Sequence, residues 1–422
     1  MKFSLIFSKK IHKDGENKEP IVTHGHTLTS KILFADIIDV VKEYGFRQNP
    51  YPVILSIENH CHLEQKDRLA EIMQEKLGDS LYILPKDWES MTEFPSPNEL
   101  KYHVLIKDKA DLVRSKQQSP GLKIASQHEI GEESASDNEE EKALNKEVSS
   151  EKPEHGSQKL YKLITLFGTS MKFHSKREIW NISSLSEGQL AKMMQKHEKE
   201  LIQANRHSFT RIFPGGFRVD SSNYDPIPGF MAGSQVIALN FQTNDLNLLL
   251  YLSKFIENGG IYSGYLLKPE FLRSGNRFYG DFQKPKLELV IKIKTAQFLK
   301  PLKEEEDVTD VIDPFIEVSI KGIDKDCKTE KTATVMNNGL NPSFKGKNNK
   351  FVFNLHCPEV AMVVFSVFDE NKLKNDRVAW YAIPVGCLRM GYRVVPLRNC
   401  VNLDFFELSS IYCKVVSTKF TN

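Results

Sequence analysis

Short β-branched segments alternate with helix-like segments over residues 20–112, and this alternation limits the possible folds more than any other feature. Apolar residues recur at helical spacing over 32–46 and 67–78. Strands that alternate with helices predict a parallel sheet covered by helices. A barrel of this kind carries its chemistry at the carboxyl ends of its strands, where this sequence places polar residues. The strand-like segments are PIVTHG, YPVILSIENH and KYHVLIK.

The composition changes between about residues 113 and 158. Glu129 to Glu141 holds seven acidic residues and neither lysine nor arginine. Large apolar residues nearly vanish, so the segment cannot bury enough surface to offset the entropy lost on ordering. We therefore predict a disordered linker that interrupts the barrel.

The alternating pattern resumes over residues 159–277 and gives way to an all-β pattern after residue 285. One helix is predicted over 186–204, capped by Ser184 or Ser186. Short strands separated by Pro, Asn, Asp and Gly turns then indicate a β-sandwich. The strand-like segments are LYKLITLF, SFTRIF and SQVIALNF in the first part, and KLELVIKIKTA, FIEVSIKG, NKFVFNLH, MVVFSVFD and RVVPL in the second.

Charge and composition exclude several classes of protein. The chain has 57 basic and 55 acidic residues, a net charge of +2, so its overall charge indicates no partner and we expect no nucleic acid ligand. No run of eighteen apolar residues occurs, and the first residues lack the length and cleavage site of a secretory signal. The six scattered cysteines are expected to be reduced thiols, as in a cytosolic protein.

A set of ordered motifs over residues 19–410 resembles eukaryotic phosphoinositide-specific phospholipase C. The X region of that family is similar to EPIVTHGHTLTSKILF, YPVILSIENHC and FPSPNELKYHVLIKDK. Its Y region is similar to RIFPGGFRVDSSNYDP, GSQVIALNFQT and NGGIYSGYLLKPEFLR, and its C2 domain to DPFIEVSI, NNGLNP and VFDENKLKND. The acidic linker resembles the delta class more than the zeta class.

The resemblance implies an architecture and a reaction. We expect an incomplete TIM-type α/β barrel, split by the disordered linker and followed by an all-β C2 sandwich. The expected domains are a partial X region (1–112), the linker (113–158), the Y region (159–277) and the C2 domain (286–416). The family cleaves phosphatidylinositol 4,5-bisphosphate into diacylglycerol and inositol trisphosphate with Ca²⁺. Phosphoinositide lipid and an anionic membrane surface are thus the expected partners of a cytoplasmic, peripheral membrane protein, and no protein partner can be named.

Two candidate residues end strand-like segments of the X region. By resemblance, His24 is the catalytic histidine that donates a proton to the diacylglycerol oxygen. Zinc binding by His24 and His26 is disfavoured, because Gly25 interrupts the strand and no third residue has the spacing of a zinc ligand. Glu58 matches a calcium ligand of the family; otherwise it would pair with a lysine, since an acid at the mouth of a buried strand needs a partner.

The substrate-binding candidates follow from the same resemblance. Lys107 and Lys109 alternate on one strand and would hold phosphates, although such a pair is usually a solvated edge. Ser184, Arg211 and Phe213 match substrate-contacting positions of the Y region. Arg211 can bind a phosphate through two nitrogen atoms, and Phe213 stands where the family usually has tyrosine, so it keeps a ring but lacks a hydroxyl.

Loop residues of the predicted sandwich suggest a second, weaker calcium site. Asp313, Asn337, Asp369 and Asn371 lie in loops that would meet at one end of the sandwich, and oxygen ligands suit calcium. Asn371 stands where the family usually has an acid, which should weaken binding. Ordinary turn chemistry is the alternative explanation for all four.

The match to the X region stops near Asp14. The family has a His-Asn pair and a Glu-x-Asp pair further upstream, and the positions of those two acids are Lys9 and Ile11 here. We therefore expect the first histidine, most calcium ligands and the presumed base to be absent, together with the amino-terminal lipid-binding and EF-hand regions. A barrel with about six of its eight strands would expose two edges. These expectations favour an incomplete gene record or a truncated product, and leave open a catalytically inactive phosphoinositide-binding or membrane-binding protein.

Overall fold

The computed structural model describes residues 10–12, 19–23, 31–59, 61–109, 157–171, 178–259, 262, 264–276, 278–301, 311–371 and 373–420. The chain divides into two compact units. The amino-terminal unit comprises Lys2–Ser184 and His207–Arg211, and the carboxyl-terminal unit comprises Leu185–Arg206 and Ile212–Asn422. The predicted linker lies largely outside the described residues.

A parallel sheet forms the centre of the amino-terminal unit, as the alternating pattern predicts. Its strands follow the order β4-β6-β7-β8-β9, and the pairs β4–β6, β6–β7 and β7–β8 are parallel. The strand predicted over LYKLITLF is shorter than expected, because a helix precedes it. The strands are β4 (Val53–Ser56), β6 (Val104–Lys109), β7 (Ile164–Gly168), β8 (Asn181–Ser186) and β9 (Phe209–Phe213).

A smaller sheet brings the first described residues beside the candidate Glu58. Its order is β3-β2-β1-β5. β1 pairs in parallel with β5, with Lys10 opposite Glu58, and runs antiparallel to β2. The strands are β1 (Lys10–His12), β2 (Ile21–Thr23), β3 (Ile32–Leu33) and β5 (Glu58–Asn59).

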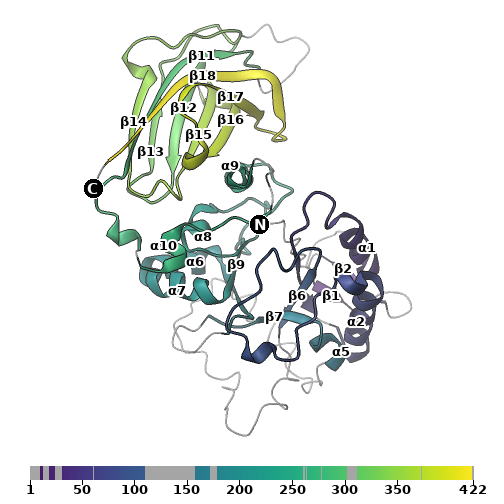
Figure 1. Ribbon diagram of the computed structural model, residues 1–422. Helices are drawn as coiled ribbons and strands as arrows, with labels where there is room; N and C mark the ends of the chain where they lie inside the picture. Colours follow the sequence, from purple (N-terminus) through teal and green to yellow (C-terminus); the bar gives the residue numbers. More distant parts are fainter. Residues whose placement is uncertain are drawn as a thin grey trace. The chain divides into compact units, whose positions relative to one another are not determined.

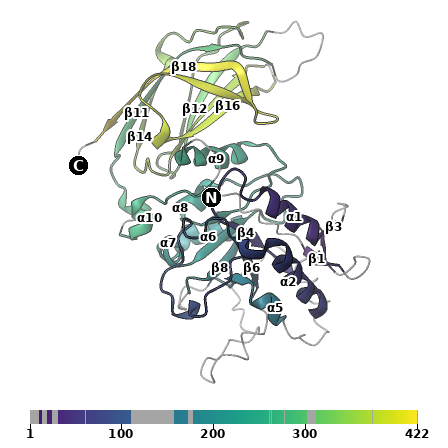
Figure 2. The ribbon, with the colours of Figure 1, turned by 45° about the vertical axis from the view of Figure 1, so that its right-hand side comes forward.

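Amphipathic helices cover one face of the parallel sheet. α1 (Phe34–Tyr44) buries Phe34, Ile37, Ile38 and Val41, the spacing of a single helical face. α2 (Leu63–Leu77) and α5 (Gln158–Tyr161) join the same core, which also contains Val104 and Ile106 of β6. Figures 1 and 2 show α1 and α2 side by side on the same side of β6.

The single helix predicted over 186–204 is wrong, because the structure has two helices there. α6 (Glu187–Lys196) ends because the next residue, His197, has a non-helical φ of −140°, and α7 (Glu198–His207) follows. Glu198 and Glu200 lie in the first turn of α7, where the helix dipole favours negative charge. The cap of α6 is Ser186, which forms a capping box with Gln189, and Ser184 instead lies within β8.

The rest of the described Y-like segment combines short helices with long loops. The strand predicted over SQVIALNF is much shorter than expected: β10 comprises only Val236–Ile237. α9 (Leu246–Lys254) starts at Asp245, whose side chain accepts a hydrogen bond from the Leu248 N–H. The remaining helices are α8 (Ile227–Met231) and α10 (Glu270–Ser274). Among the described residues no helix has the length and apolar character that crossing a bilayer requires.

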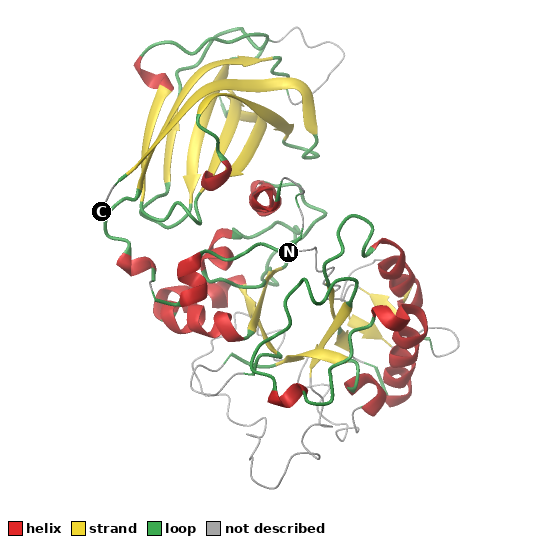
Figure 3. Ribbon diagram, in the orientation of Figure 1, coloured by secondary structure: helices red, strands yellow, loops and turns green. Residues whose placement is uncertain are grey.

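The predicted sandwich forms the end of the chain. Its strand order is β13-β12-β15-β16-β17-β18-β11-β14, and β16 meets β17 only at Ala379 and Trp380, where one layer passes into the other. Figure 3 shows these strands wrapped around a common interior. They are β11 (Leu287–Gln297), β12 (Pro314–Lys321), β13 (Lys328–Lys331), β14 (Lys350–Leu355), β15 (Met362–Asp369), β16 (Asp376–Pro384), β17 (Gly391–Asn399) and β18 (Phe405–Lys419).

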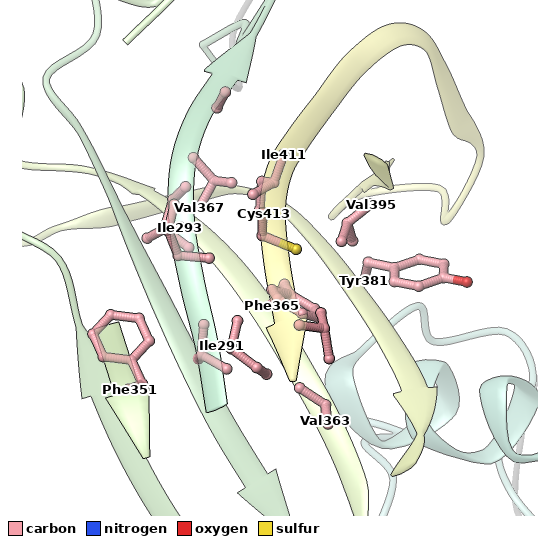
Figure 4. Packing of buried hydrophobic residues seen from close by; sticks show 14 of the residues in the cluster. Ile291, Ile293, Phe351, Val363, Phe365, Val367, Tyr381, Val395, Ile411 and Cys413 are labelled. Carbon is pink, nitrogen blue, oxygen red and sulfur yellow. The ribbon is translucent and has the colours of Figure 1, made fainter. Parts of the chain in front are cut away.

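Alternation along each strand fills the sandwich core. Ile291 and Ile293 of β11 meet Phe365 of β15 and Cys413 of β18, all fully buried, as Figure 4 shows. A second cluster joins the sandwich to α9, since Leu248 and Leu249 pack with Met362, Val364 and Trp380. The sandwich and the helices that precede it therefore share an apolar core within one compact unit.

Candidate functional site

An apolar layer lies on the face of the parallel sheet that α1 and α2 do not cover. Ile54, Leu105, Leu166 and Ile182 contribute to one buried cluster, and Phe209 packs against it. These residues come from β4, β6, β7, β8 and β9 in turn. Each strand thus directs one side chain of this layer to the same face.

A polar layer follows two residues further along four of these strands. Because side chains alternate along a strand, a residue two positions on faces the same way. The residues so placed are Ser56, Lys107, Ser184 and Arg211. The parallel strands carry this layer toward their carboxyl ends, where a barrel of this kind presents its chemistry. The amino-terminal unit therefore has an apolar floor beneath a polar, basic layer.

The two basic residues of this layer differ in exposure. Arg211 is only 7% exposed, whereas Lys107 is half-buried. Lys107 lies opposite Ser56 on one side and Leu166 on the other. Lys109 shares the face of Lys107 by alternation, but its side chain is outside the described residues. The intervening Asp108 is 5% exposed and belongs to the opposite face.

Glu58 lies just past the end of β4. The Ile57 N–H donates to the Lys107 carbonyl oxygen at 2.8 Å, which holds this segment alongside β6. Glu58 itself is half-buried in β5. The Asn59 side-chain oxygen accepts a hydrogen bond from the Cys61 N–H, and burial raises the pKa of the Cys61 thiol to about 11. Cys61 is therefore a packing residue rather than a nucleophile.

The remaining candidates of the barrel are two histidines outside the described residues and one residue each in β8 and β9. His24 and His26 lie outside the described residues, directly after β2. Ser184 is exposed within β8. Phe213 is half-buried and ends β9, two residues after Arg211. The roles assigned to these residues by resemblance stay predictions.

The sequence reasoning missed an ion pair that holds the loop after β9. The Arg218 Nε and Nη2 atoms donate to the two carboxylate oxygens of Glu187 at 2.6 and 2.7 Å. The Gly215 N–H donates to the same carboxylate at 2.9 Å. Burial raises the pKa of Glu187, but the hydrogen bonds from Arg218 and Gly215 outweigh it, and the net shift is downward. The pairing joins the start of α6 to a loop about thirty residues away and left no local pattern in the sequence.

We predict that Glu187→Gln loosens the segment from Gly215 to Ser222. The variant loses charge-assisted hydrogen bonds worth about 1.5–3 kcal/mol, so amide exchange of Gly215 should quicken by roughly tenfold or more at pH 7. Because the pKa of Glu187 is lowered in the folded chain, this stabilisation exists above the unfolded pKa of about 4.3 and disappears as pH falls through the folded value. Parent and variant should therefore converge only in acid.

The matched control for this prediction is Glu270→Gln. Glu270 pairs with Arg273 on the surface, with its own side chain 72% exposed, and such pairs contribute little. Hydrogen exchange measured by mass spectrometry on both variants gives the comparison. Equal protection of Gly215 in the parent and Glu187→Gln would show that the pair does not hold the loop.

Three of the four candidates in the sandwich come together. The Asp313 N–H donates to the Asp369 carboxylate at 2.8 Å, and the Asn337 N–H donates to the Asp313 carboxylate at 2.5 Å. Asn337 has a positive φ of 52°, which asparagine tolerates better than most residues. The Asn371 side chain instead donates to Asp376, the first residue of β16, at 3.1 Å.

These groups fit the donor chemistry of calcium but are few. Calcium takes about six to eight oxygen ligands, and both carboxylates already accept backbone hydrogen bonds. Within the described ranges no three His, Cys, Asp or Glu side chains form a group that could hold a metal ion. Because a carboxylate has about four acceptor sites, these hydrogen bonds do not by themselves prevent Asp313 and Asp369 from binding a cation.

Three domains of known proteins match successive parts of the chain. The X domain of phosphatidylinositol-specific phospholipase C matches residues 10–110, its Y domain matches residues 160–271, and a C2 domain matches residues 287–400. The chain belongs to the phosphoinositide-specific phospholipase C family, which confirms the resemblance and the expected barrel and sandwich.

Similar proteins include enzymes and an inactive homologue. The rat 1-phosphatidylinositol 4,5-bisphosphate phosphodiesterase delta-1 is 34% identical over 420 residues, which cover 95% of this chain and 54% of the relative. The mouse "inactive phospholipase C-like protein 2" is 32% identical, with 96% of this chain and 36% of the relative covered. The crystal structure of L. pealei PLC21 has a TM-score of 0.76 and 29% identity, and covers 98% of this chain and 51% of that one. The chain spans about half the length of rat delta-1.

Proposed function

We propose that this protein recognises phosphatidylinositol 4,5-bisphosphate as a phospholipase C that cleaves it to diacylglycerol and inositol trisphosphate, with catalysis impaired in this chain because Lys9 and Ile11 stand where the family is expected to have two acids. The observation that carries the proposal is the polar layer of the parallel sheet. Lys107, Ser184 and Arg211 share one face, toward the carboxyl ends of their strands, in a chain of the phospholipase C family. The membrane partner is an anionic cytoplasmic surface, to which the protein binds peripherally.

The residues divide into binding and chemical roles. Lys107, Lys109 and Arg211 supply positive charge for the 4- and 5-phosphates, and arginine can bind a phosphate with two parallel hydrogen bonds. Ser184 adds a hydroxyl, and the Phe213 ring stacks on the inositol. In this proposal, specificity for the phosphorylated headgroup comes mainly from the polar layer of the parallel sheet.

The bond-breaking step needs proton transfer at the phosphodiester. His24 is the proposed acid that protonates the diacylglycerol oxygen as it leaves. Glu58 is the proposed calcium ligand, and it follows β4 two residues after Ser56, the residue that pairs with Lys107 of β6. Bound calcium would polarise the phosphate and lower the pKa of the attacking inositol hydroxyl.

A second candidate function is phosphoinositide binding without cleavage. Lys9 and Ile11 replace two acids of the family, and one relative is designated inactive. Both candidates require the same headgroup recognition, so they differ only in turnover.

Headgroup recognition is tested by calorimetry on the full chain. Inositol 1,4,5-trisphosphate should bind at least about tenfold more tightly than inositol 1-phosphate, because each charge-assisted phosphate contact contributes about 1.5–3 kcal/mol. The measurement is repeated with calcium and with a chelator. Equal affinity for the two ligands would contradict both candidate functions.

A further inference from the structure

Three lysines lie directly opposite one another on the outer face of the sandwich. Lys292 of β11 is paired with Lys350 of β14 on one side and with Lys414 of β18 on the other. Tyr392 of β17 follows Lys414 in the same row. The strand register thus aligns three positive charges and one aromatic ring across four neighbouring strands.

This row faces away from the sandwich core. Lys292 stands between Ile291 and Ile293, which are both 0% exposed in the core, so its own side chain points outward. Lys350 and Lys414 are exposed, and Lys292 is half-buried. The lysine ammonium groups are therefore available to a partner in solution.

A row of like charges destabilises the sheet that carries it. Opposite residues on neighbouring strands have Cβ atoms about 4.5–5.5 Å apart, and like charges there repel. Among residues 287–301 and 311–420, wherever the structure describes them, no acid forms an ion pair with Lys292, Lys350 or Lys414. The Lys414 Nζ atom lies 5.5 Å from the centroid of the Tyr392 ring. The other layer differs, since Lys328 of β13 pairs with Glu330 at 2.7 Å.

Apolar and aromatic side chains border the row on both sides. On one side, Val290 lies opposite Val352 and Val416, which are 36% and 41% exposed. On the other side, Val394 is 65% exposed and lies opposite Tyr412, whose ring stacks on Tyr392 with 5.7 Å between centroids. The face therefore combines positive charge with exposed apolar surface on a sheet.

We propose that this face of the sandwich, the lysine face, binds directly to a bilayer that contains anionic lipid, without calcium. The lysine face comprises Lys292, Lys350, Lys414, Tyr392, Val352, Val394 and Val416. Sheet faces are broad and shallow, which suits a planar partner. The lysines would lie among the lipid headgroups, while tyrosine rings and valines contact the interface, where amphipathic side chains are favoured. The inference deepens the proposed membrane partnership by naming a surface distinct from the headgroup-binding layer.

The test uses the full chain and vesicles that contain no phosphoinositide. Phosphatidylcholine vesicles with or without phosphatidylserine are sedimented in a calcium chelator. The lysine-face variant is Lys292→Gln, Lys350→Gln and Lys414→Gln together. Each basic residue near an anionic surface strengthens binding about fivefold, so the triple change should weaken binding roughly 100-fold at low salt. The difference should shrink as salt rises.

A second triple variant removes the same charge elsewhere. Lys321→Gln, Lys325→Gln and Lys331→Gln change three lysines in and beside β12 and β13, in the other layer. We expect this control to lose less than about fivefold in binding. The melting temperature checks folding, and the lysine-face variant should melt no lower than the parent because it relieves repulsion.

Weaker vesicle binding by the lysine-face variant than by the control variant would support the proposal. An equal loss in both variants would mean that net charge alone attracts the chain, and an unchanged lysine-face variant would also overturn the proposal. If the lysine-face variant loses binding to polyglutamate but binds vesicles as well as the parent does, the partner of this face is an acidic protein instead. Inositol trisphosphate affinity, measured in parallel, reports on the proposed function separately and should not change in either variant.

Discussion

Replacing Lys107 and Arg211 together with alanine should lower the affinity for inositol trisphosphate by about two to four orders of magnitude. Each residue is proposed to make a charge-assisted phosphate contact worth about 1.5–3 kcal/mol, and a tenfold change in affinity corresponds to about 1.4 kcal/mol. Calorimetry on the single and double variants measures the loss. The single variants should each show part of it.

Two comparisons separate lost recognition from lost structure. Arg211 is only 7% exposed, so Arg211→Met keeps most of its volume and should lose binding with less effect on folding than Arg211→Ala. Arg47→Ala is the matched surface control, since Arg47 pairs with Glu43 and its side chain is 57% exposed. Unchanged affinity in the double variant would remove both residues from the site.

The purified chain should hydrolyse phosphatidylinositol 4,5-bisphosphate at close to the background rate. By resemblance, Lys9 and Ile11 stand where the family has two acids. Loss of positioned acid–base groups alone lowers rates by about two to four orders of magnitude. Release of inositol trisphosphate from mixed vesicles, with and without calcium, measures this. A calcium-dependent rate within about tenfold of an active delta-class relative, assayed in parallel, would contradict the prediction.

Restoring the acids distinguishes the two candidate functions. Lys9→Glu with Ile11→Asp places an acid in β1, which pairs in parallel with β5, the strand that carries Glu58. A calcium-dependent gain of about tenfold or more would support an impaired enzyme, because metal and acid–base groups each contribute rate. Lys42→Glu, on an exposed position of α1, controls for added charge. No gain in the restored variant would favour the binding protein.

Local patterns in the sequence predicted much of the fold. The apolar spacing of α1 and the capping residue Ser186 both depend on residues within a few positions of each other, and both appear in the structure. The break at His197 was missed because the apolar pattern continues through it. β10 was predicted too long, since a β-branched run says nothing of where its pairing partner ends.

The candidate site was predicted less completely, for a similar reason. The resemblance supplied Lys107 and Arg211, but only the strand order shows that they share a face above an apolar floor. The Glu187–Arg218 pair joins two segments whose contact depends on the tertiary fold. The lysine row likewise depends on strand register, which periodicity alone does not specify.

The core that α9 shares with the sandwich has a mechanical consequence. Met362, Val364 and Trp380 are covered by the leucines of α9, so the sandwich cannot turn freely as a domain on a flexible tether would. Tilting it against α9 would expose these side chains to water, which is unfavourable in proportion to the apolar area uncovered. Any orientation that a bilayer imposes on the sandwich is therefore passed on to α9 as torque rather than absorbed by a hinge.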